Sequence, residues 1–251
     1  MQPAPDETLD LLAGDWRIVQ LRRGHRFTTD DLLTAWLAWQ VRPDARRLLD
    51  IGAGIGSVGL LTLWKMAPDA HLTMVEVQAL SHGLARKTLA INGLESRVTA
   101  RNGDLRDPAM VPDGEIYDLI TGSPPYIPPG KGIMSSHPQR AAARIELHGD
   151  VYDYCRTAAR ALAPDGWFCF VHAAADPRPE RAIAAAGLTL RRRVDVYFRS
   201  TQPPTIALFA ASWGGEREDG PPVVVRDAEG AFTPEVLALR REMGASLRAA
   251  G

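Results

Sequence analysis

Four residues, Ser123-Pro124-Pro125-Tyr126, follow the apolar stretch Tyr117–Ile120 closely and form a pattern that could do chemistry. Proline fixes the backbone angle φ and has no N–H group, so the pair makes a rigid segment whose carbonyl groups stay free as acceptors. The Ser123 oxygen and the Pro124 carbonyl could accept hydrogen bonds from an amine, and the Tyr126 ring could stack on a planar base. The segment could therefore hold a flat, amine-bearing group for attack on an electrophile, a reaction that depends mainly on alignment. Taken alone, it could equally be a rigid loop.

A glycine-rich sequence upstream, Asp50 to Gly56, offers a place for the carrier of that electrophile. Glycines between a strand and a helix let the backbone approach a ligand, and the helix that follows presents free N–H groups. Glu76 ends the next strand and could accept from both hydroxyls of a ribose, while Asp104 follows the third strand and could accept from an adenine amine. Ligands of such sheets bind at the carboxyl ends of the strands. The predicted cofactor-binding residues of these loops are Asp50, Gly52, Gly54, Gly56, Glu76, Val77, Asp104 and Leu105.

Two cofactors fit the glycine loop. The spacing Gly54-x-Gly56-x-x-Gly59 satisfies the dinucleotide fingerprint, and Glu76 lies near the expected distance from it. The leading Asp50 and the additional Asp104 favour S-adenosylmethionine instead. Combined with the Ser-Pro-Pro-Tyr segment, the loop predicts an S-adenosylmethionine-dependent methyltransferase that acts on an amine. A nicotinamide-dependent oxidoreductase stays open as an alternative, although no Tyr-x-x-x-Lys or histidine constellation supports it.

Strands and helices that alternate along the chain must position both motifs. The pattern predicts strands at 47–51, 71–76, 97–101, 116–121 and 167–172, and helices at 57–67, 79–91, 150–163 and 178–186. Two further strands near 188–197 and 204–212, joined by Ser200–Pro204, predict a terminal antiparallel hairpin. Together these elements predict an α/β fold with a Rossmann-like, doubly wound, seven-stranded and mostly parallel sheet.

The segments at the two ends of the chain differ in composition from this alternating part. Residues 1–45 form a short predicted extension, with a loose tail over 1–8, a strand over 16–23 and a helix over 32–39 that Thr28–Asp31 would cap. The methyltransferase domain is predicted over 46–213. The remainder, 214–251, is predicted as a Gly- and Pro-rich linker followed by a helix over 233–249.

The composition limits the classes of function. The 251 residues carry a net charge of -1, so any contact with nucleic acid must come from a local patch. The two cysteines, Cys155 and Cys169, have no metal-ligand spacing, and the histidines are scattered, so we expect neither a disulfide framework nor a metal site. No apolar run approaches the ~20 residues of a membrane span. We expect a cytoplasmic protein that does not contact membranes, and the sequence does not indicate an oligomeric state.

Residues 15–212 resemble class I methyltransferases, and Ser123–Tyr126 is similar to the Asn/Asp/Ser-Pro-Pro-aromatic motif of enzymes that methylate exocyclic amines. Two further segments, Gly24–Leu33 and Arg140–Glu146, resemble the bacterial tRNA N6-adenine methyltransferases that act beside the anticodon. This resemblance implies that Phe27 and Thr28 border the cofactor and that the acceptor is adenine in tRNA. The family usually has asparagine where this chain has Ser123, and serine is more usual in enzymes that act on the amine of cytosine.

Basic residues near the predicted site could contact the phosphates of such an RNA. We expect Lys131, Arg140 and Arg144 to bind substrate, and the sequence Gly130-Lys131-Gly132 suggests a mobile lid. The predicted catalytic residues are Ser123, Pro124, Pro125 and Tyr126. Alternatives to an RNA acceptor are a protein glutamine or a small-molecule amine, and a non-catalytic RNA-binding module that has kept the fold also stays open.

Overall fold

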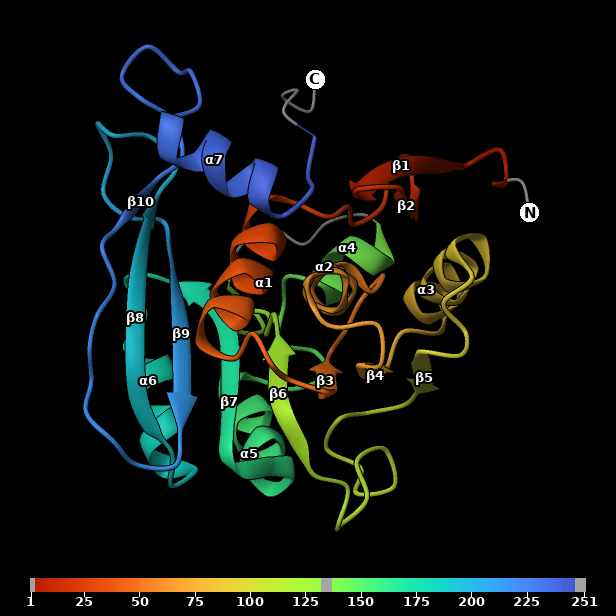
Figure 1. The fold of residues 1–251 in the computed structure, drawn as a ribbon, viewed down its shortest axis with the longest axis horizontal. Helices are drawn as coiled ribbons and strands as arrows, with labels where there is room; N and C mark the ends of the chain where they lie inside the picture. Colours follow the sequence, from red (N-terminus) through yellow and green to blue (C-terminus); the bar gives the residue numbers. More distant parts are fainter. Residues whose placement is uncertain (1–2, 132–136, 247–251) are drawn as a thin grey trace.

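The computed structural model describes residues 3–131 and 137–246 and shows a central sheet with helices on both faces (Figure 1). The strands are β1 (Glu7–Ala13), β2 (Trp16–Leu21), β3 (Arg47–Ile51), β4 (His71–Glu76), β5 (Val98–Asn102), β6 (Tyr117–Gly122), β7 (Leu162–Ala173), β8 (Thr189–Tyr197), β9 (Ile206–Ser212) and β10 (Val223–Val224). The helices are α1 (Thr29–Val41), α2 (Ser57–Lys65), α3 (Ala79–Asn92), α4 (Pro138–Ala142), α5 (Val151–Ala161), α6 (Arg178–Ala185) and α7 (Pro234–Glu242). Gly132 of the suggested lid and residues 247–249 of the predicted last helix lie outside the described residues.

The central sheet has the order β10-β8-β9-β7-β6-β3-β4-β5 within the described chain. Seven of these strands are the predicted ones, and the α/β, Rossmann-like fold with its antiparallel terminal hairpin is confirmed. β9 pairs antiparallel with both β7 and β8, whereas the other pairs are parallel. The eighth strand, β10, is a two-residue segment inside the stretch predicted as linker and helix, and it pairs with the outer edge of β8.

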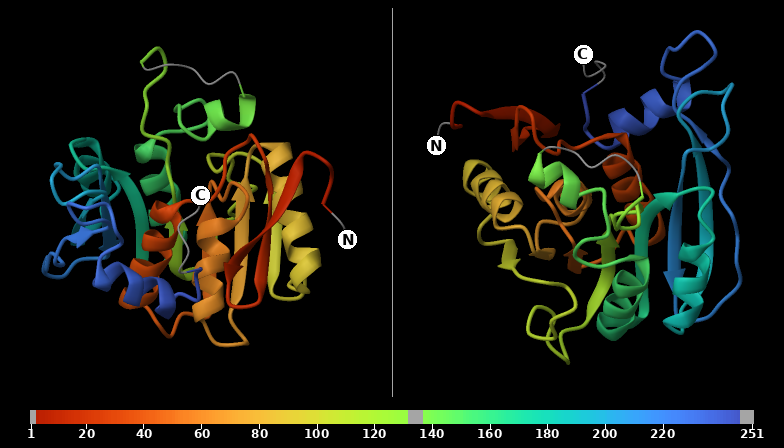
Figure 2. Two further views of the ribbon diagram at one scale, coloured as in Figure 1. Left: turned by 90° about the horizontal axis from the view of Figure 1, so that it is seen from above. Right: turned by 180° about the vertical axis from the view of Figure 1, so that it is seen from behind.

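Two apolar layers hold the helices against the sheet. One buried cluster joins α1, α2 and α3 to one face, and a second joins α5 and α6 to the other face (Figures 1 and 2). Central strands are buried on both sides, which explains the continuous apolar runs, such as Leu48-Leu49 in β3, that the sequence pattern detected. Because the parallel strands all end at the same edge, the loops after β3, β4 and β6 meet there.

The N-terminal segment is more ordered than the sequence suggested. The tail expected over residues 1–8 is wrong at its end, since β1 begins at Glu7 and pairs antiparallel with β2 in a separate two-stranded sheet. The Glu7 side chain is buried and forms an ion pair with Lys87 of α3, with 2.5 Å between Oε1 and Nζ. A partner on another element therefore anchors a residue whose own neighbourhood gives no strand signal.

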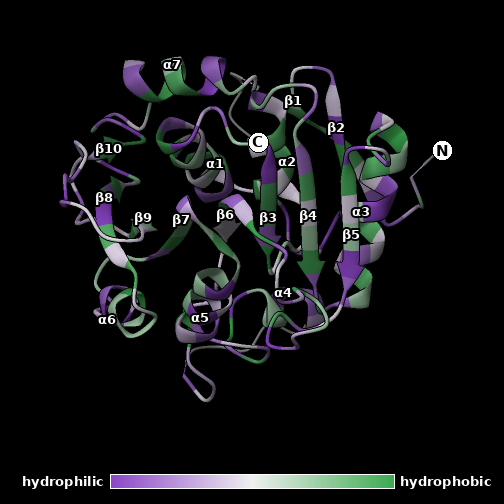
Figure 3. Ribbon diagram, turned by 60° about the horizontal axis from the view of Figure 1, so that its bottom comes forward, coloured by the Kyte–Doolittle hydropathy of each residue, from purple (hydrophilic) through white to green (hydrophobic). Residues whose placement is uncertain are grey.

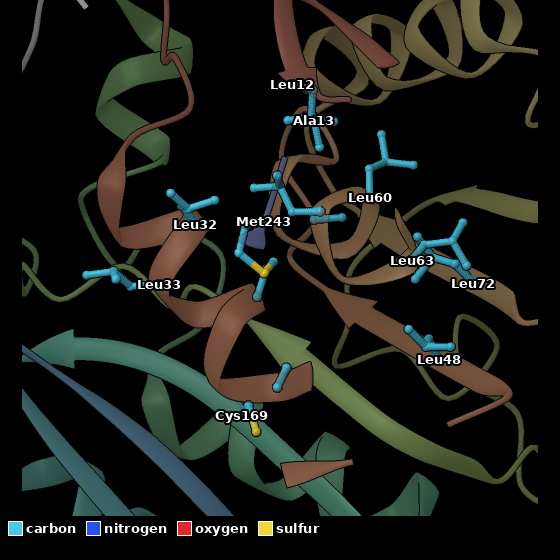
Figure 4. Packing of buried hydrophobic residues seen from close by; sticks show 14 of the residues in the cluster. Leu12, Ala13, Leu32, Leu33, Leu48, Leu60, Leu63, Leu72, Cys169 and Met243 are labelled. Carbon is cyan, nitrogen blue, oxygen red and sulfur yellow. The ribbon is translucent and has the colours of Figure 1, made fainter. Parts of the chain in front are cut away.

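The C-terminal segment completes the first apolar cluster. Met243, which follows α7, is fully buried among residues from β1, α1 and α2 (Figure 4). The same cluster holds Leu12 of β1 and Cys169 of β7, so both ends of the chain share one core with the central sheet. Of the described helices, none is long and apolar enough to cross a membrane.

Candidate active site

A cavity of about 410 Å³ opens where the loops after β3, β4 and β6 meet. Its walls include the glycine loop, the end of β4, the Ser-Pro-Pro-Tyr segment and the residues before α1. The structure therefore brings together the two motifs that the sequence separated. Of the predicted site residues, those that line the cavity are Thr28, Asp50, Gly52, Gly54, Glu76, Val77, Leu105, Ser123, Pro124, Pro125, Tyr126, Arg140 and Arg144.

The glycine loop has a backbone that few other residues could adopt. Gly52 and Gly54 have φ of +64° and +57°, in the left-handed region. A Cβ atom at Gly52 would lie 1.9 Å from the hydroxyl oxygen of Tyr154, whereas one at Gly54 would meet no atom within 4 Å. Gly52 thus permits Tyr154 to pack closely against the loop, whereas Gly54 leaves space for a ligand in the cavity. Gly56 caps α2 with a φ of +89° and lies outside the cavity lining.

Asp50 shapes the loop from inside the fold. Its side chain is almost fully buried and accepts hydrogen bonds from the Gly59 N–H (3.0 Å) and the Thr121 hydroxyl (2.8 Å). Burial raises the pKa of Asp50 to about 6. Because Thr121 lies two residues before Ser123, Asp50 connects the start of α2 to the strand that carries the Ser-Pro-Pro-Tyr segment.

Glu76 stands at the end of β4 with both oxygens aimed at backbone donors. Oε2 accepts from the Gly54 N–H at 2.8 Å and Oε1 from the Gln78 N–H at 2.7 Å. Burial raises the pKa of the carboxyl group. Each oxygen keeps a further lone pair, so the side chain can both fix the glycine loop and accept from a ribose.

Asp104 lies differently from its neighbours. Arg106 occupies its carboxylate through the guanidinium group and through the backbone N–H, and this hydrogen bonding lowers the pKa of Asp104. Gly103 and Leu105 line the cavity, but Asp104 does not. The contact with an adenine amine that the sequence predicts would need an oxygen that the structure commits to Arg106.

The Ser-Pro-Pro-Tyr segment follows β6 and presents an unused acceptor. Ser123 Oγ is buried and has no hydrogen-bond partner among the described residues. Burying a polar atom without a hydrogen bond is costly, and a bound ligand could supply the missing bond. Burial raises the pKa of Tyr126, so the hydroxyl stays neutral, and its ring meets the buried His172 edge-on with the centroids 5.5 Å apart.

The start of α1 adds two carboxyl groups that the sequence suggested only as caps. Asp31 accepts from the Thr28 N–H at 2.8 Å, and burial raises the pKa of both Asp30 and Asp31 to about 6. Both line the cavity. Phe27 instead packs against the first apolar cluster.

The three predicted basic residues have separate positions. Arg140 donates to the carbonyl groups of Arg23 and Gly24, both at 3.2 Å, and so fastens the N-terminal segment. Arg144 lines the cavity and is exposed. Lys131 lies in an exposed turn outside the cavity lining.

Sequence reasoning missed several polar side chains at the cavity, among them Tyr154 and Ser81. Tyr154 projects from α5 beneath the glycine loop, and burial raises the pKa of its hydroxyl above the usual range. Neither belongs to a local motif. Only the folded structure brings them close to the cavity.

The cavity fits S-adenosylmethionine better than a dinucleotide. Four carboxyl groups with raised pKa values line it, namely Asp30, Asp31, Asp50 and Glu76. S-adenosylmethionine carries a sulfonium and an ammonium group, which such a lining attracts, whereas it would repel a pyrophosphate. The described residues contain no group of three or more His, Cys, Asp or Glu side chains arranged to hold a metal ion.

Fold and cavity together define a Rossmann-like methyltransferase. A solved structure with a similar fold is that of Atu636 from Agrobacterium tumefaciens, described as a predicted O-methyltransferase, with a TM-score of 0.62 and 21% identity over 88% of this chain and 100% of that one. At this identity the likeness concerns the fold alone.

Residues 28–183 match the model of the methyltransferase small domain, and the chain belongs to that family. Curated relatives include the tRNA1(Val) (adenine(37)-N6)-methyltransferases of Salmonella typhi, 30% identical over 73% of this chain and 74% of the relative, and of Shewanella amazonensis, 26% identical over 87% and 91%. The protein is thus an S-adenosylmethionine-dependent methyltransferase, and the oxidoreductase alternative is rejected.

Proposed function

We propose that this methyltransferase modifies the exocyclic N6 amine of adenine in a transfer RNA. The observation that carries the proposal is Ser123, which lines the cavity and whose buried hydroxyl oxygen has no hydrogen-bond partner among the described residues. The names of the relatives support adenine in tRNA as the acceptor. The exposed Arg144 at the same cavity offers a contact for an RNA phosphate.

The segment Ser123–Tyr126, here called the acceptor loop, aligns the amine with the cofactor. Ser123 Oγ and the Pro124 carbonyl accept the two N–H bonds of the amine, which turns the nitrogen lone pair toward the cofactor side of the cavity. Tyr126 stacks on the base. S-adenosylmethionine, when bound, supplies the electrophilic methyl group. The amine proton leaves to water after the nitrogen has become cationic, so the site needs no strong general base.

The acidic side chains act on the other half of the site. Glu76 accepts from the ribose and also holds the glycine loop through Gly54. Asp30 and Asp31 lie at the α1 side of the cavity, where carboxylates attract the ammonium group of the cofactor.

The test is methyl transfer from labelled S-adenosylmethionine into tRNA from a strain that lacks this gene, followed by nucleoside mass spectrometry. A peak of N6-methyladenosine in tRNA is the expected result. Ser123→Ala should lower kcat about 10- to 100-fold, because it removes a hydrogen bond to a group that becomes charged. Tyr126→Ala should mainly raise KM for RNA, since stacking contributes about 1–3 kcal/mol per base. Ser200→Ala, in the exposed turn between β8 and β9, is the matched control.

Absence of labelled RNA while the protein still binds S-adenosylhomocysteine would contradict the RNA acceptor. Full activity of the Ser123→Ala, Tyr126→Ala double variant would contradict the assignment of the acceptor loop.

A further inference from the structure

Helix α4 follows the acceptor loop and lies across the end of the sheet, near the carboxyl ends of β3 and β4 (Figure 3). Arg140 of this helix lines the cavity, and so do Ala142 and Ala143 at its end. The lining that adjoins α4 includes Gly24, His25 and Ser81, from the N-terminal segment and the first turn of α3. The cavity is therefore bounded by three segments that are far apart in the sequence.

Gln139 of α4 joins these three segments. Its side chain is only 1% exposed, which is unusual for glutamine. Oε1 accepts from the His25 N–H at 3.0 Å, and Nε2 donates to the Ser81 hydroxyl at 3.0 Å. One side chain thus ties α4 to both adjoining segments of the cofactor cavity.

Gly24 is shaped to receive this side chain. A Cβ atom at Gly24 would lie 2.2 Å from Gln139 Oε1 and 2.7 Å from Leu21 Cβ, so any larger residue would displace the amide and press on Leu21. Beside it, the Arg140 guanidinium group donates to the Gly24 carbonyl at 3.2 Å. Contacts of the same helix therefore hold the backbone around Gly24 from both sides.

We propose that Gln139 is a positioning residue that fastens α4 over the cofactor cavity, and that its two hydrogen bonds must open for S-adenosylmethionine to enter and for S-adenosylhomocysteine to leave. Gln139 itself is not among the side chains that line the cavity. Its effect on the ligand is indirect, because it holds together the segments that line the cavity. The proposal concerns cofactor exchange and does not depend on the RNA acceptor.

A fastening of this kind has a kinetic signature. Loss of a direct contact with a ligand raises mainly the dissociation rate. A contact that must break during both binding and release of the ligand slows both steps. Its loss raises the association rate and the dissociation rate together, so the equilibrium affinity changes less than either rate. The ratio of the two effects therefore separates a gate from an ordinary binding residue.

The experiment measures both rates for the full-length protein with tritiated S-adenosylmethionine, by rapid filtration for association and by a chase with unlabelled S-adenosylhomocysteine for dissociation. Gln139→Met keeps the length of the side chain and removes both hydrogen bonds. Gly24→Ala displaces the same amide from the other side and provides a second variant if the first is too unstable. Gln202→Met, in the exposed turn between β8 and β9, is the matched control.

We expect both rates to rise about tenfold or more in Gln139→Met and Gly24→Ala, because two buried hydrogen bonds no longer hold the closed form. The double variant should be no faster than either single variant, since both break one fastening. Unchanged rates in a folded variant would overturn the proposal. A rise in the dissociation rate alone would also overturn it, because that result defines a direct or general binding effect.

Discussion

Gly52→Ala is the substitution whose effect the structure defines most closely. The added Cβ atom would lie 1.9 Å from the Tyr154 hydroxyl oxygen, 2.7 Å from Cζ and 3.1 Å from Cε1. The backbone there has a φ of +64°, which alanine adopts at a cost of about 1–2 kcal/mol. Two separate penalties therefore act at one position.

The size of the second penalty follows from the packing of Tyr154. This side chain is 5% exposed and belongs to the second apolar cluster, so it cannot simply turn away into solvent. Overpacking of such a site costs about 1–3 kcal/mol. The sum is about 2–5 kcal/mol in the free energy of unfolding. For a chain of this size, each kcal/mol corresponds to a fall in Tm of about 2–4 °C.

Gly54→Ala provides the matched comparison. Its φ of +57° gives the same strain, but the new Cβ would meet no atom within 4 Å. We expect this variant to lose about 1–2 kcal/mol of stability and to bind the cofactor more weakly because the methyl group takes cavity space. Chemical denaturation gives the stabilities, and calorimetric titration with S-adenosylhomocysteine gives the affinities.

Tyr154→Phe then tests the cause. It removes the hydroxyl that lies 1.9 Å from the new Cβ, although Cζ at 2.7 Å remains, so recovery in the Gly52→Ala background should be partial. A Gly52→Ala protein no less stable than Gly54→Ala would refute the reasoning. So would a double variant in which the two destabilisations simply add.

Two further predictions follow from the carboxyl groups of the cavity. Burial raises the pKa values of Asp30, Asp31 and Asp50 to about 6, so these groups favour the protein's folded state when protonated, and their contribution to stability is lost as pH rises from about 4 through 6. A cationic ligand favours the ionised forms, so S-adenosylmethionine should bind about tenfold more weakly at pH 5 than at pH 7 for each carboxyl group that is linked to binding. Calorimetry should detect proton release on binding. An affinity that is the same at pH 5 and pH 7 would contradict this linkage. Glu76→Gln should weaken cofactor binding about 10-fold or more, because an amide has one oxygen for the two N–H groups of Gly54 and Gln78 and brings its own NH2 against one of them, and an unchanged Kd would show that neither bond matters.

The sequence predicted the central elements closely. The bounds of β3 and β4 agree with the predicted ones. Short apolar runs between turns are typical of strands in a sheet whose two faces are both covered by helices. β7 begins at Leu162, five residues before the prediction, because its first residues extend the pairing with β6 beyond the apolar core of the strand. β1 and β10 escaped prediction, since each is held by a neighbour distant in sequence.

Local motifs in the sequence predicted part of the cavity lining. Ser123–Tyr126 and the glycine loop are contiguous, and both line the cavity. Gln139 could not be found in this way, because its partners His25 and Ser81 lie 114 and 58 residues away. Asp104 shows the converse limit, since it follows the expected strand but does not line the cavity, and the arginine two positions later occupies its carboxylate.

The burial of Met243 determines when this chain can finish folding. The cluster that Met243 enters also contains Leu12 and the apolar faces of α1 and α2 (Figure 4). During synthesis Leu12 emerges long before Met243. The core beneath α1 and α2 therefore cannot be completed until residue 243 has left the ribosome. Apolar surface is exposed throughout that interval, and contacts between residues so far apart in the chain form slowly. The nascent chain therefore exposes this apolar surface until the residues around Met243 have been synthesised.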